Sequence, residues 1–121
     1  MLEKPHKKLD VWQGAMKAAQ TVYKLTDKLP KTEKFGLISQ MRRSAVSIPC
    51  NIAEGAARQG KREFRNFLSM AQGSLSELDT QLELTVLLDY LSRTDLEEVN
   101  TQLIGVDKML TGLIRHLKAN A

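Results

Sequence analysis

The stretch Gln40-Met-Arg-Arg-Ser-Ala-Val-Ser-Ile-Pro-Cys-Asn-Ile-Ala-Glu-Gly55 decides how this chain folds. Its apolar residues recur at alternating steps of three and four, the spacing that keeps one face of a helix apolar. Pro49 stands inside this helix, where it removes an amide donor and crowds the carbonyl of Ala45, so we expect a bend. A helix that accepts an interior proline needs compensation from its packing partners, so the stretch predicts a helix held in place by tertiary contacts.

Outside this stretch, the same spacing of apolar residues appears in three further segments, and no window shows sustained period-two alternation. Helices joined by short loops pack as antiparallel neighbours. The sequence therefore predicts an all-α fold, an antiparallel up-down four-helix bundle that forms one domain over residues 1–121. We expect its helices at roughly residues 8–28, 33–58, 61–91 and 95–118.

Local signals at the breaks support these ranges. Pro30 ends the first helix, because the residue before a proline resists the helical region, and Thr32 is expected to cap the second helix. Gly60 precedes the third helix and offers it no side-chain cap. Thr94 and Glu97 have the spacing of a capping box, so we expect the fourth helix to begin there.

The predicted third and fourth helices carry more apolar surface than one packing seam uses. The additional apolar residues are Leu84, Leu87, Leu88 and Leu91 in the third helix and Ile104, Met109 and Ile114 in the fourth. Either these helices are central in the bundle, or they also contact another subunit. We favour the second interpretation and expect a homo-oligomer.

The composition is that of a soluble globular protein, with 42% apolar and 26% charged residues. No apolar run approaches the roughly 20 residues that a membrane-spanning helix needs, and the first residues do not resemble a secretory signal. The single cysteine, Cys50, excludes an internal disulfide and any multi-cysteine metal site. We therefore expect a cytoplasmic protein with no membrane partner.

Charge is distributed unevenly along the chain. Residues 1–65 contain 14 Lys and Arg against 6 Asp and Glu, which gives +8, whereas residues 66–121 contain 4 against 8, which gives −4. This split predicts one basic face and one acidic face. The basic face would suit nucleic acid or an acidic protein, and the alternative is that opposite charges meet across a subunit contact.

No catalytic constellation is visible in the sequence. The two histidines, His6 and His116, lie at opposite ends of the chain, and neither has a carboxylate at the spacing that di-iron bundles need. The serines have no histidine close in sequence to act as a base, and no glycine-rich phosphate loop follows a strand. We therefore expect a protein that is not an enzyme and that holds no cofactor and no metal.

A polar stripe crosses two of the predicted helices. Its members are Ser47, Asn51 and Glu54 in the second helix and Ser74 and Glu77 in the third. If the two stripes face each other, Asn51 and Ser74 can satisfy one another's hydrogen bonds, and such pairs fix the register of a bundle. Arg58 lies one helical turn after Glu54 and is expected to form an ion pair with it. We favour a structural network over a binding pocket at this stripe.

The candidate nucleic-acid-binding residues are all basic. They are Arg58, Lys61, Arg62 and Arg65 around the loop between the second and third helices, and Arg42 and Arg43 roughly 24 Å earlier on the second helix. Arginines on a rigid scaffold bind phosphate well. Few exposed aromatic residues are expected among them, so we predict contacts to the backbone that are weakly sequence-specific and sensitive to salt, without base stacking. The alternative is a surface whose charges serve solubility.

The residues quoted above resemble a known family, the small bacterial four-helix-bundle proteins encoded in intervening sequences of large-subunit ribosomal RNA genes. That family is similar in turn to the accessory variability proteins of diversity-generating retroelements. The matching residues are Leu9-Asp-Val-Trp12-Gln13, Leu29-Pro30, Glu33-Lys-Phe35-Gly36-Leu37, Gln40 to Pro49, Asn51-Ile-Ala-Glu54-Gly55, Arg58, Glu63-Phe64 and Ala71-Gln-Gly73-Ser74-Leu75-Ser-Glu77-Leu78. The fourth predicted helix matches in pattern only.

The resemblance implies an up-down four-helix bundle that assembles as a homopentamer, a ring with a basic face. The retroelement relatives are accessory factors that bind nucleic acid and a reverse transcriptase, whereas members encoded in ribosomal RNA genes have no settled function. Two positions depart from the family pattern: Cys50 stands where a serine is common, and Gly60 stands where a serine or threonine is common. Gly60 is expected to weaken the start of the third helix by about a few tenths of a kcal/mol.

We therefore expect a non-enzymatic, oligomeric scaffold or accessory protein that binds the backbone of RNA or DNA with low sequence specificity through these basic positions. The alternative is a protein-interaction module whose basic face docks an acidic partner, such as a reverse transcriptase, without direct nucleic-acid binding.

Overall fold

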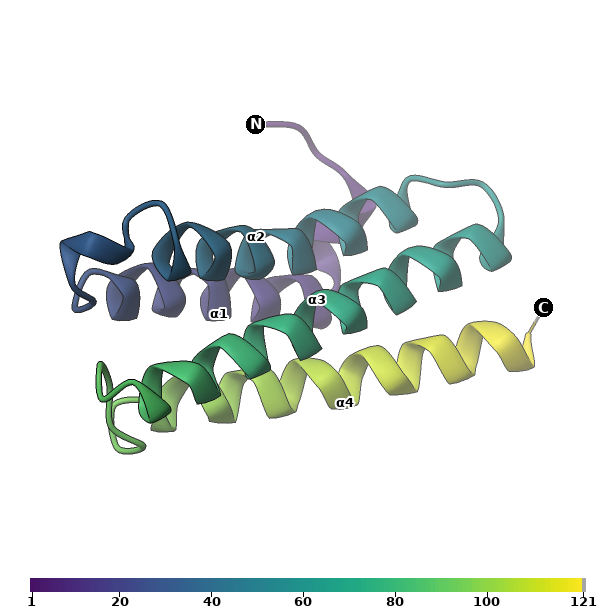
Figure 1. Cartoon of the computed structure of the whole chain (residues 1–121). Coiled ribbons are helices and arrows are strands. Elements are labelled where there is room, and N and C mark those ends of the chain that lie inside the picture. Colours follow the sequence, from purple (N-terminus) through teal and green to yellow (C-terminus); the bar gives the residue numbers. More distant parts are fainter. Residues whose placement is uncertain (121) are drawn as a thin grey trace.

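The computed structural model describes residues 1–120 and contains no strand within them. Its elements are the 3-10 helices η1 (Pro5–Lys8) and η2 (Lys31–Glu33) and the α-helices α1 (Asp10–Thr26), α2 (Leu37–Ala56), α3 (Lys61–Leu87) and α4 (Glu97–Ala119). The four α-helices run alternately up and down along one bundle (Figure 1). The predicted all-α four-helix bundle is thus confirmed.

Each α-helix packs against its neighbours in the chain, and α1 also packs against α4, which closes the bundle. The contact between α2 and α3 is the most extensive of these. The short helix η1 packs on both α1 and α2. This places the N-terminal lysines at the end of the bundle where α1 begins, α2 ends and α3 begins (Figure 1).

The core is built from all four α-helices, at positions that the three-four spacing predicts. Its largest fully buried apolar side chains are Val22 from α1, Met41, Ile48 and Ile52 from α2, Leu68, Leu78 and Leu82 from α3, and Val99, Val106 and Leu110 from α4. Burying one such side chain stabilises the fold by about 1.5–3 kcal/mol. The quoted stretch therefore contributes its apolar face to the centre of the bundle.

Close packing surrounds the unusual residues of α2. The helix runs from Leu37 to Ala56 although Pro49 lies inside it, and Pro49 itself is buried. At Gly55, an added Cβ would lie 2.7 Å from the Cβ of Phe67 and 3.0 Å from the Cδ1 of Phe64, both on α3. The ends of α2 and α3 approach closely because residue 55 has no side chain.

The start of α2 differs from the prediction. Thr32 does not cap this helix, because residues Lys31–Glu33 form the separate helix η2 and α2 begins at Leu37. The Glu33 side chain takes that role instead, since its Oε1 accepts a hydrogen bond from the amide of Leu37 at 3.2 Å. The prediction failed because α2 begins at Leu37, five residues after Thr32, and the longer side chain of Glu33 reaches its first amide.

The predicted capping box at Thr94 and Glu97 is wrong. A reciprocal pair forms at Ser92 and Asp95 instead: the Ser92 amide donates to Asp95 Oδ2 at 2.9 Å, and the Asp95 amide donates to Ser92 Oγ at 3.1 Å. Both hydrogen bonds hold the pKa of Asp95 below its usual value, and the one from the Ser92 amide has the larger effect. The loop therefore continues past Asp95, and α4 begins at Glu97 without a side-chain cap.

Helix α3 ends at Leu87 and not at residue 91 as expected. Asp89 adopts a left-handed backbone conformation with φ of 59°, and the Tyr90 amide donates to the Thr85 carbonyl at 2.9 Å. A single left-handed residue of this kind commonly terminates a helix. The remaining helix ends lie within about two residues of the expected positions, the usual uncertainty of such boundaries.

The additional apolar residues of α3 and α4 divide into two groups. Leu91 is buried, and Met109 and Ile114 pack against the core. The other four, Leu84, Leu87, Leu88 and Ile104, are exposed, with Leu87 reaching 76%. Among residues 1–120, no helix is both long enough and apolar enough to cross a membrane.

Candidate functional site

Four of the six candidate cations gather where α2 ends and α3 begins. We call this surface the basic end and define it as Arg58, Lys61, Arg62 and Arg65. Helix α3 begins at Lys61 after Gly60, which supplies no side-chain cap, as expected. The first amides of a helix have no hydrogen-bond partner within the helix, and the helix dipole is positive at this end. A cation placed there is therefore disfavoured by about 0.3–1 kcal/mol. The arrangement favours an anion at this point.

Arg58 is engaged within the protein. It forms the expected ion pair with Glu54 at 3.1 Å and lies 3.9 Å from Glu63. Its guanidinium also lies over the ring of Phe67, 5.0 Å from the ring centroid. Because all three charged groups are exposed, the ion pairs contribute little, about 0–1 kcal/mol each.

The other members of the basic end differ in how many of their side-chain donors already have a hydrogen-bond partner. Lys61 Nζ donates to the backbone carbonyl of Asn120 at 2.6 Å, which connects the start of α3 with the end of α4. Arg62 is exposed and makes no hydrogen bond or ion pair within residues 1–120. The Nε of Arg65 is buried and has no hydrogen-bond partner in that range. Arg62 and the terminal nitrogens of Arg65 therefore keep donors that a phosphate can reach, whereas the buried Nε of Arg65 is out of its reach.

Arg42 connects α2 with α1. Its Nε donates to Thr26 Oγ1 at 2.8 Å, and its terminal nitrogen donates to Asp27 Oδ1 at 2.9 Å and to the Tyr23 carbonyl at 3.4 Å. The guanidinium also lies 4.5 Å from the centroid of the Tyr23 ring. Its donors are largely occupied, so the structure places Arg42 in the helix–helix contact between α1 and α2.

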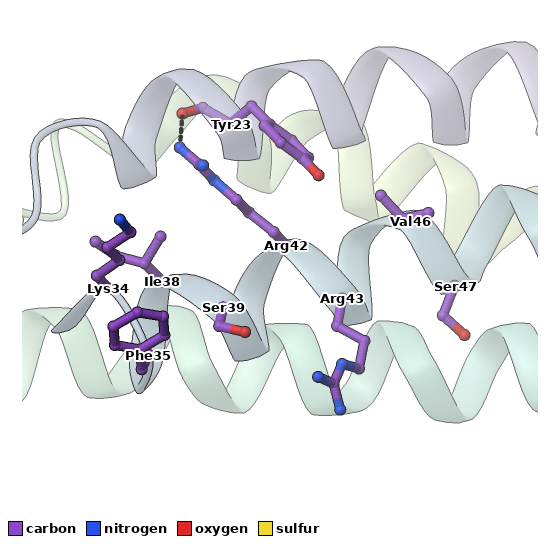
Figure 2. Close-up of a pocket in the computed structure, with 9 residues that line it drawn as sticks. All are labelled: Tyr23, Lys34, Phe35, Ile38, Ser39, Arg42, Arg43, Val46 and Ser47. Carbon is purple, nitrogen blue, oxygen red and sulfur yellow. Dashed lines mark hydrogen bonds between the residues drawn. The ribbon is translucent and has the colours of Figure 1, made fainter.

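Arg43 lies in different surroundings. It is exposed and has no hydrogen-bond or ion-pair partner within the described residues. Figure 2 shows its side chain on the side of α2 away from Arg42 and Tyr23. About 22 Å of helix separates Arg43 from Arg58 at 1.5 Å per residue. The six candidate cations therefore form two separate groups.

The polar stripes of α2 and α3 do face each other. Ser47 Oγ and Ser74 Oγ lie 2.8 Å apart in a hydrogen bond across the two helices. Asn51 does not bond Ser74 directly, because its amide nitrogen donates to the Ser47 carbonyl at 2.9 Å and to Ser47 Oγ at 3.0 Å. Ser47 is thus the residue that joins the other two.

A second polar contact links the same helices one turn away. Ser44 Oγ donates to Glu77 Oε1 at 2.7 Å, and the hydroxyl also lies 3.0 Å from the Gln40 carbonyl. The polar stripe predicted from the sequence did not include Ser44. Its position three residues before Ser47 continues the spacing of Ser47 and Asn51 and could have identified it. Glu54 stands apart from this network and pairs with Arg58.

A pocket of about 660 Å³ opens beside the N-terminal half of α2. It is lined by Tyr23, Lys34, Phe35, Ile38, Ser39, Arg42, Arg43, Val46 and Ser47 (Figure 2). Two aromatic residues lie in it, Phe35, which is 90% exposed, and Tyr23, which is 43% exposed. Sequence reasoning expected few aromatic residues beside the cations, and the structure corrects this, because folding brings Tyr23 from α1 next to Arg42.

The loop that carries Phe35 is held in place by Glu33. Besides capping α2, Glu33 accepts a hydrogen bond from the Tyr90 hydroxyl through Oε2 at 2.9 Å. This hydrogen bond is the main reason why the pKa of Tyr90 is raised above its usual value. A Cβ on Gly36 would lie 2.7 Å from Glu33 Oε1, so the glycine leaves room for the carboxylate.

Within residues 1–120, no group of three or more His, Cys, Asp or Glu side chains is arranged to hold a metal ion. The single cysteine, Cys50, is exposed.

The fold and this surface define a small up-down four-helix bundle with exposed arginines on α2 and α3 and an open pocket between α1 and the N-terminal half of α2. Residues 7–112 match the sequence profile of the 23S rRNA-intervening sequence proteins, and the chain belongs to this family. The family expected from the sequence is thereby confirmed.

A solved structure agrees with this assignment. The chain is similar to a protein of unknown function from the S23 ribosomal protein family of Bacteroides thetaiotaomicron VPI-5482, determined by crystallography at 1.70 Å resolution. The TM-score is 0.79 and the sequence identity 28%, over 86% of this chain and 97% of the other. No curated protein sequence matches the chain.

Proposed function

We propose that this protein is a non-enzymatic scaffold or accessory protein that binds the nucleic-acid backbone with low sequence specificity. The contacts run through the basic end and Arg43. The rest of the bundle serves to hold these cations in fixed positions.

The placement of Lys61, Arg62 and Arg65 in the first two turns of α3 carries this proposal. Cations at this end of a helix act against the helix dipole, and Glu63 is the acidic residue within that first turn. A phosphate bound there turns an unfavourable arrangement into a favourable one, because it meets both the side-chain donors and the open amides. Arg62 and the terminal nitrogens of Arg65 make no hydrogen bond or ion pair within residues 1–120, which supports the same conclusion.

The remaining candidates take supporting roles in this proposal. Arg58 can exchange its exposed partner Glu54 for a phosphate at little cost, since such ion pairs are weak. Arg42 holds α2 to α1 through Thr26, and Lys61 uses one of its three donors on the Asn120 carbonyl and keeps two for a phosphate.

We also propose that the protein acts as a homo-oligomer, for which the resemblance implies a pentamer. The exposed apolar residues Leu84, Leu87, Leu88 and Ile104 support a contact between copies. A ring would present several basic ends to one strand, and linked weak sites gain affinity through effective concentration.

The test measures binding of fluorescein-labelled RNA and DNA to the full chain over a range of salt concentrations. The double variant Arg62→Glu with Arg65→Glu should weaken binding at least about tenfold and make the salt dependence shallower, because two phosphate contacts become repulsions. Its matched control is Lys17→Glu with Lys24→Glu, which makes the same charge change on α1 and should have a smaller effect.

Unchanged binding in the Arg62 and Arg65 variant would show that these contacts are wrong. The rival function, docking of an acidic protein such as a reverse transcriptase, has its own readout. A partner that stays bound in pull-downs after nuclease treatment, together with no affinity for RNA or DNA, would favour it.

A further inference from the structure

The pocket around Phe35 has features that backbone binding does not require. A phenyl ring that is 90% exposed adds little to the stability of the fold. Nevertheless its loop is anchored on two sides through Glu33, which bonds the start of α2 and the hydroxyl of Tyr90. The ring is therefore presented on a fixed support, which is the arrangement of a contact residue.

The charged side chains that line the pocket are all of one sign. The residues that line the pocket include three cations, Lys34, Arg42 and Arg43, and no carboxylate. Lys34 Nζ lies 5.4 Å from the centroid of the Phe35 ring. Of the three cations, Arg42 is neutralised by Asp27, so the open ones are Lys34 and Arg43.

The geometry sets the ring and Arg43 along one side of α2. Phe35 lies in the turn before α2, and Ser39 and Arg43 follow on the helix at four-residue spacing. Figure 2 shows the Phe35 ring and the Arg43 side chain on the side of α2 that faces away from Tyr23. The pocket volume of about 660 Å³ falls within the range of small-ligand sites. An aromatic face beside cations fits a nucleotide, because bases stack on the ring while phosphates meet the cations.

We propose that this pocket binds an unpaired nucleotide of a single strand of RNA or DNA. The base stacks on Phe35, and Lys34 and Arg43 contact the neighbouring phosphates. A duplex hides the faces of its bases, so the pocket gives the protein a preference for single strands. An acidic peptide would satisfy the cations but would make no comparable use of the ring. This inference rests on the proposed function and adds a second, separate contact to it.

The experiment compares two probes on the full chain, a labelled oligouridylate of about 15 nucleotides and a blunt RNA duplex of similar length. Phe35→Ala should weaken binding of the single strand roughly 5- to 150-fold, the loss expected for one stacked base. Duplex binding should stay within about twofold, because it makes no stacking contact.

Two further variants separate stacking from general apolar contact. Phe35→Trp should keep the affinity for the single strand. Oligouridylate should quench the tryptophan fluorescence of this variant more than that of the wild type, whose only tryptophan is Trp12. Phe35→Leu should lose affinity like Phe35→Ala. Met70→Ala is the matched control, since it also shortens an exposed apolar side chain but lies on α3, away from the pocket. Because Phe35 is exposed, all these variants should keep the wild-type melting temperature.

The outcomes distinguish this inference from the proposed function. If the wild type binds neither probe, both fail. If it binds both probes and Phe35→Ala changes nothing, or weakens both equally, the nucleotide pocket is wrong while backbone binding stands. If Phe35→Ala changes the oligomeric state, or releases a protein partner that resists nuclease, the ring belongs to a protein contact and the inference is overturned.

Discussion

The two ends of α2 are fixed to their neighbours in opposite ways. At the C-terminal end, Gly55 lets α3 approach until an added Cβ would stand 2.7 Å from the Cβ of Phe67. At the N-terminal end, the long side chain of Arg42 reaches across to Thr26 and Asp27 on the α1 side. Where α2 and α3 approach closely at Gly55, the cations of the basic end lie on the surface. Where the long Arg42 side chain connects α2 with α1, the two helices stand far enough apart to leave a pocket. The same helix thus offers phosphate contacts at one end and a base-sized recess at the other.

The largest expected effect is at Gly55. Gly55→Ala should lower the free energy of unfolding by about 1–3 kcal/mol, because the new methyl group overpacks the contact with Phe64 and Phe67. Gly73→Ala is the control within α3: an added Cβ there meets nothing within 4 Å, and the change should stabilise by about 0.5–1 kcal/mol. Urea unfolding measures both. Equal stability of the two variants would mean that the close approach of α2 and α3 is not what fixes this end.

A smaller effect is expected at the other end of α2. Arg42→Ala should destabilise the fold by about 1–2 kcal/mol, since it removes charged hydrogen bonds to Thr26, which is fully buried, and to Asp27. Arg43→Ala, one residue away, should change stability by less than about 0.5 kcal/mol while weakening nucleic-acid binding. The same urea experiment, combined with the RNA-binding assay, compares the two neighbours. If Arg43→Ala destabilised the fold as much as Arg42→Ala, the division of roles between them would be wrong.

The smallest effect concerns the support of the Phe35 loop. The Glu33 carboxylate accepts a hydrogen bond from the Tyr90 hydroxyl, and this raises the pKa of Tyr90 above its ordinary value near 10. A raised pKa in the folded state gives stability that is present below pH 10 and is lost as the pH rises through the folded value. Tyr90→Phe should therefore melt at a lower temperature than the wild type at neutral pH, and this difference should shrink above about pH 10. Thermal melts followed by circular dichroism test this, and a difference that is constant with pH would contradict it.

Much of the fold could be read from spacing alone. Apolar residues at three-four intervals identify the face of each helix, and the buried set, including Met41, Ile48 and Ile52, follows that face. Helix boundaries were harder, because several polar residues near each break compete for the same amides. Glu33 capped α2 in place of Thr32, and Asp95 took the reciprocal hydrogen bonds expected of Glu97.

The candidate site was predictable only in part. Charge and composition pick out the six cations, and the ion pair of Arg58 with Glu54 follows from their distance along one helix. Nothing in the local pattern tells Arg42 from Arg43, since that difference depends on which of them faces α1. The 90% exposure of Phe35 could not be read from the sequence either, because it depends on how the turn before α2 is held by Glu33.

The sequence by itself determined the helical class, the number of helices and the core faces, since these follow from local periodicity and the burial of apolar surface. The tertiary structure alone decided which cations remain open, where the polar stripes bond and that Phe35 and Tyr23 join the same pocket. Those features depend on contacts between α1, α2 and α3. Residues far apart in the chain meet there, and no spacing along one helix specifies such a meeting.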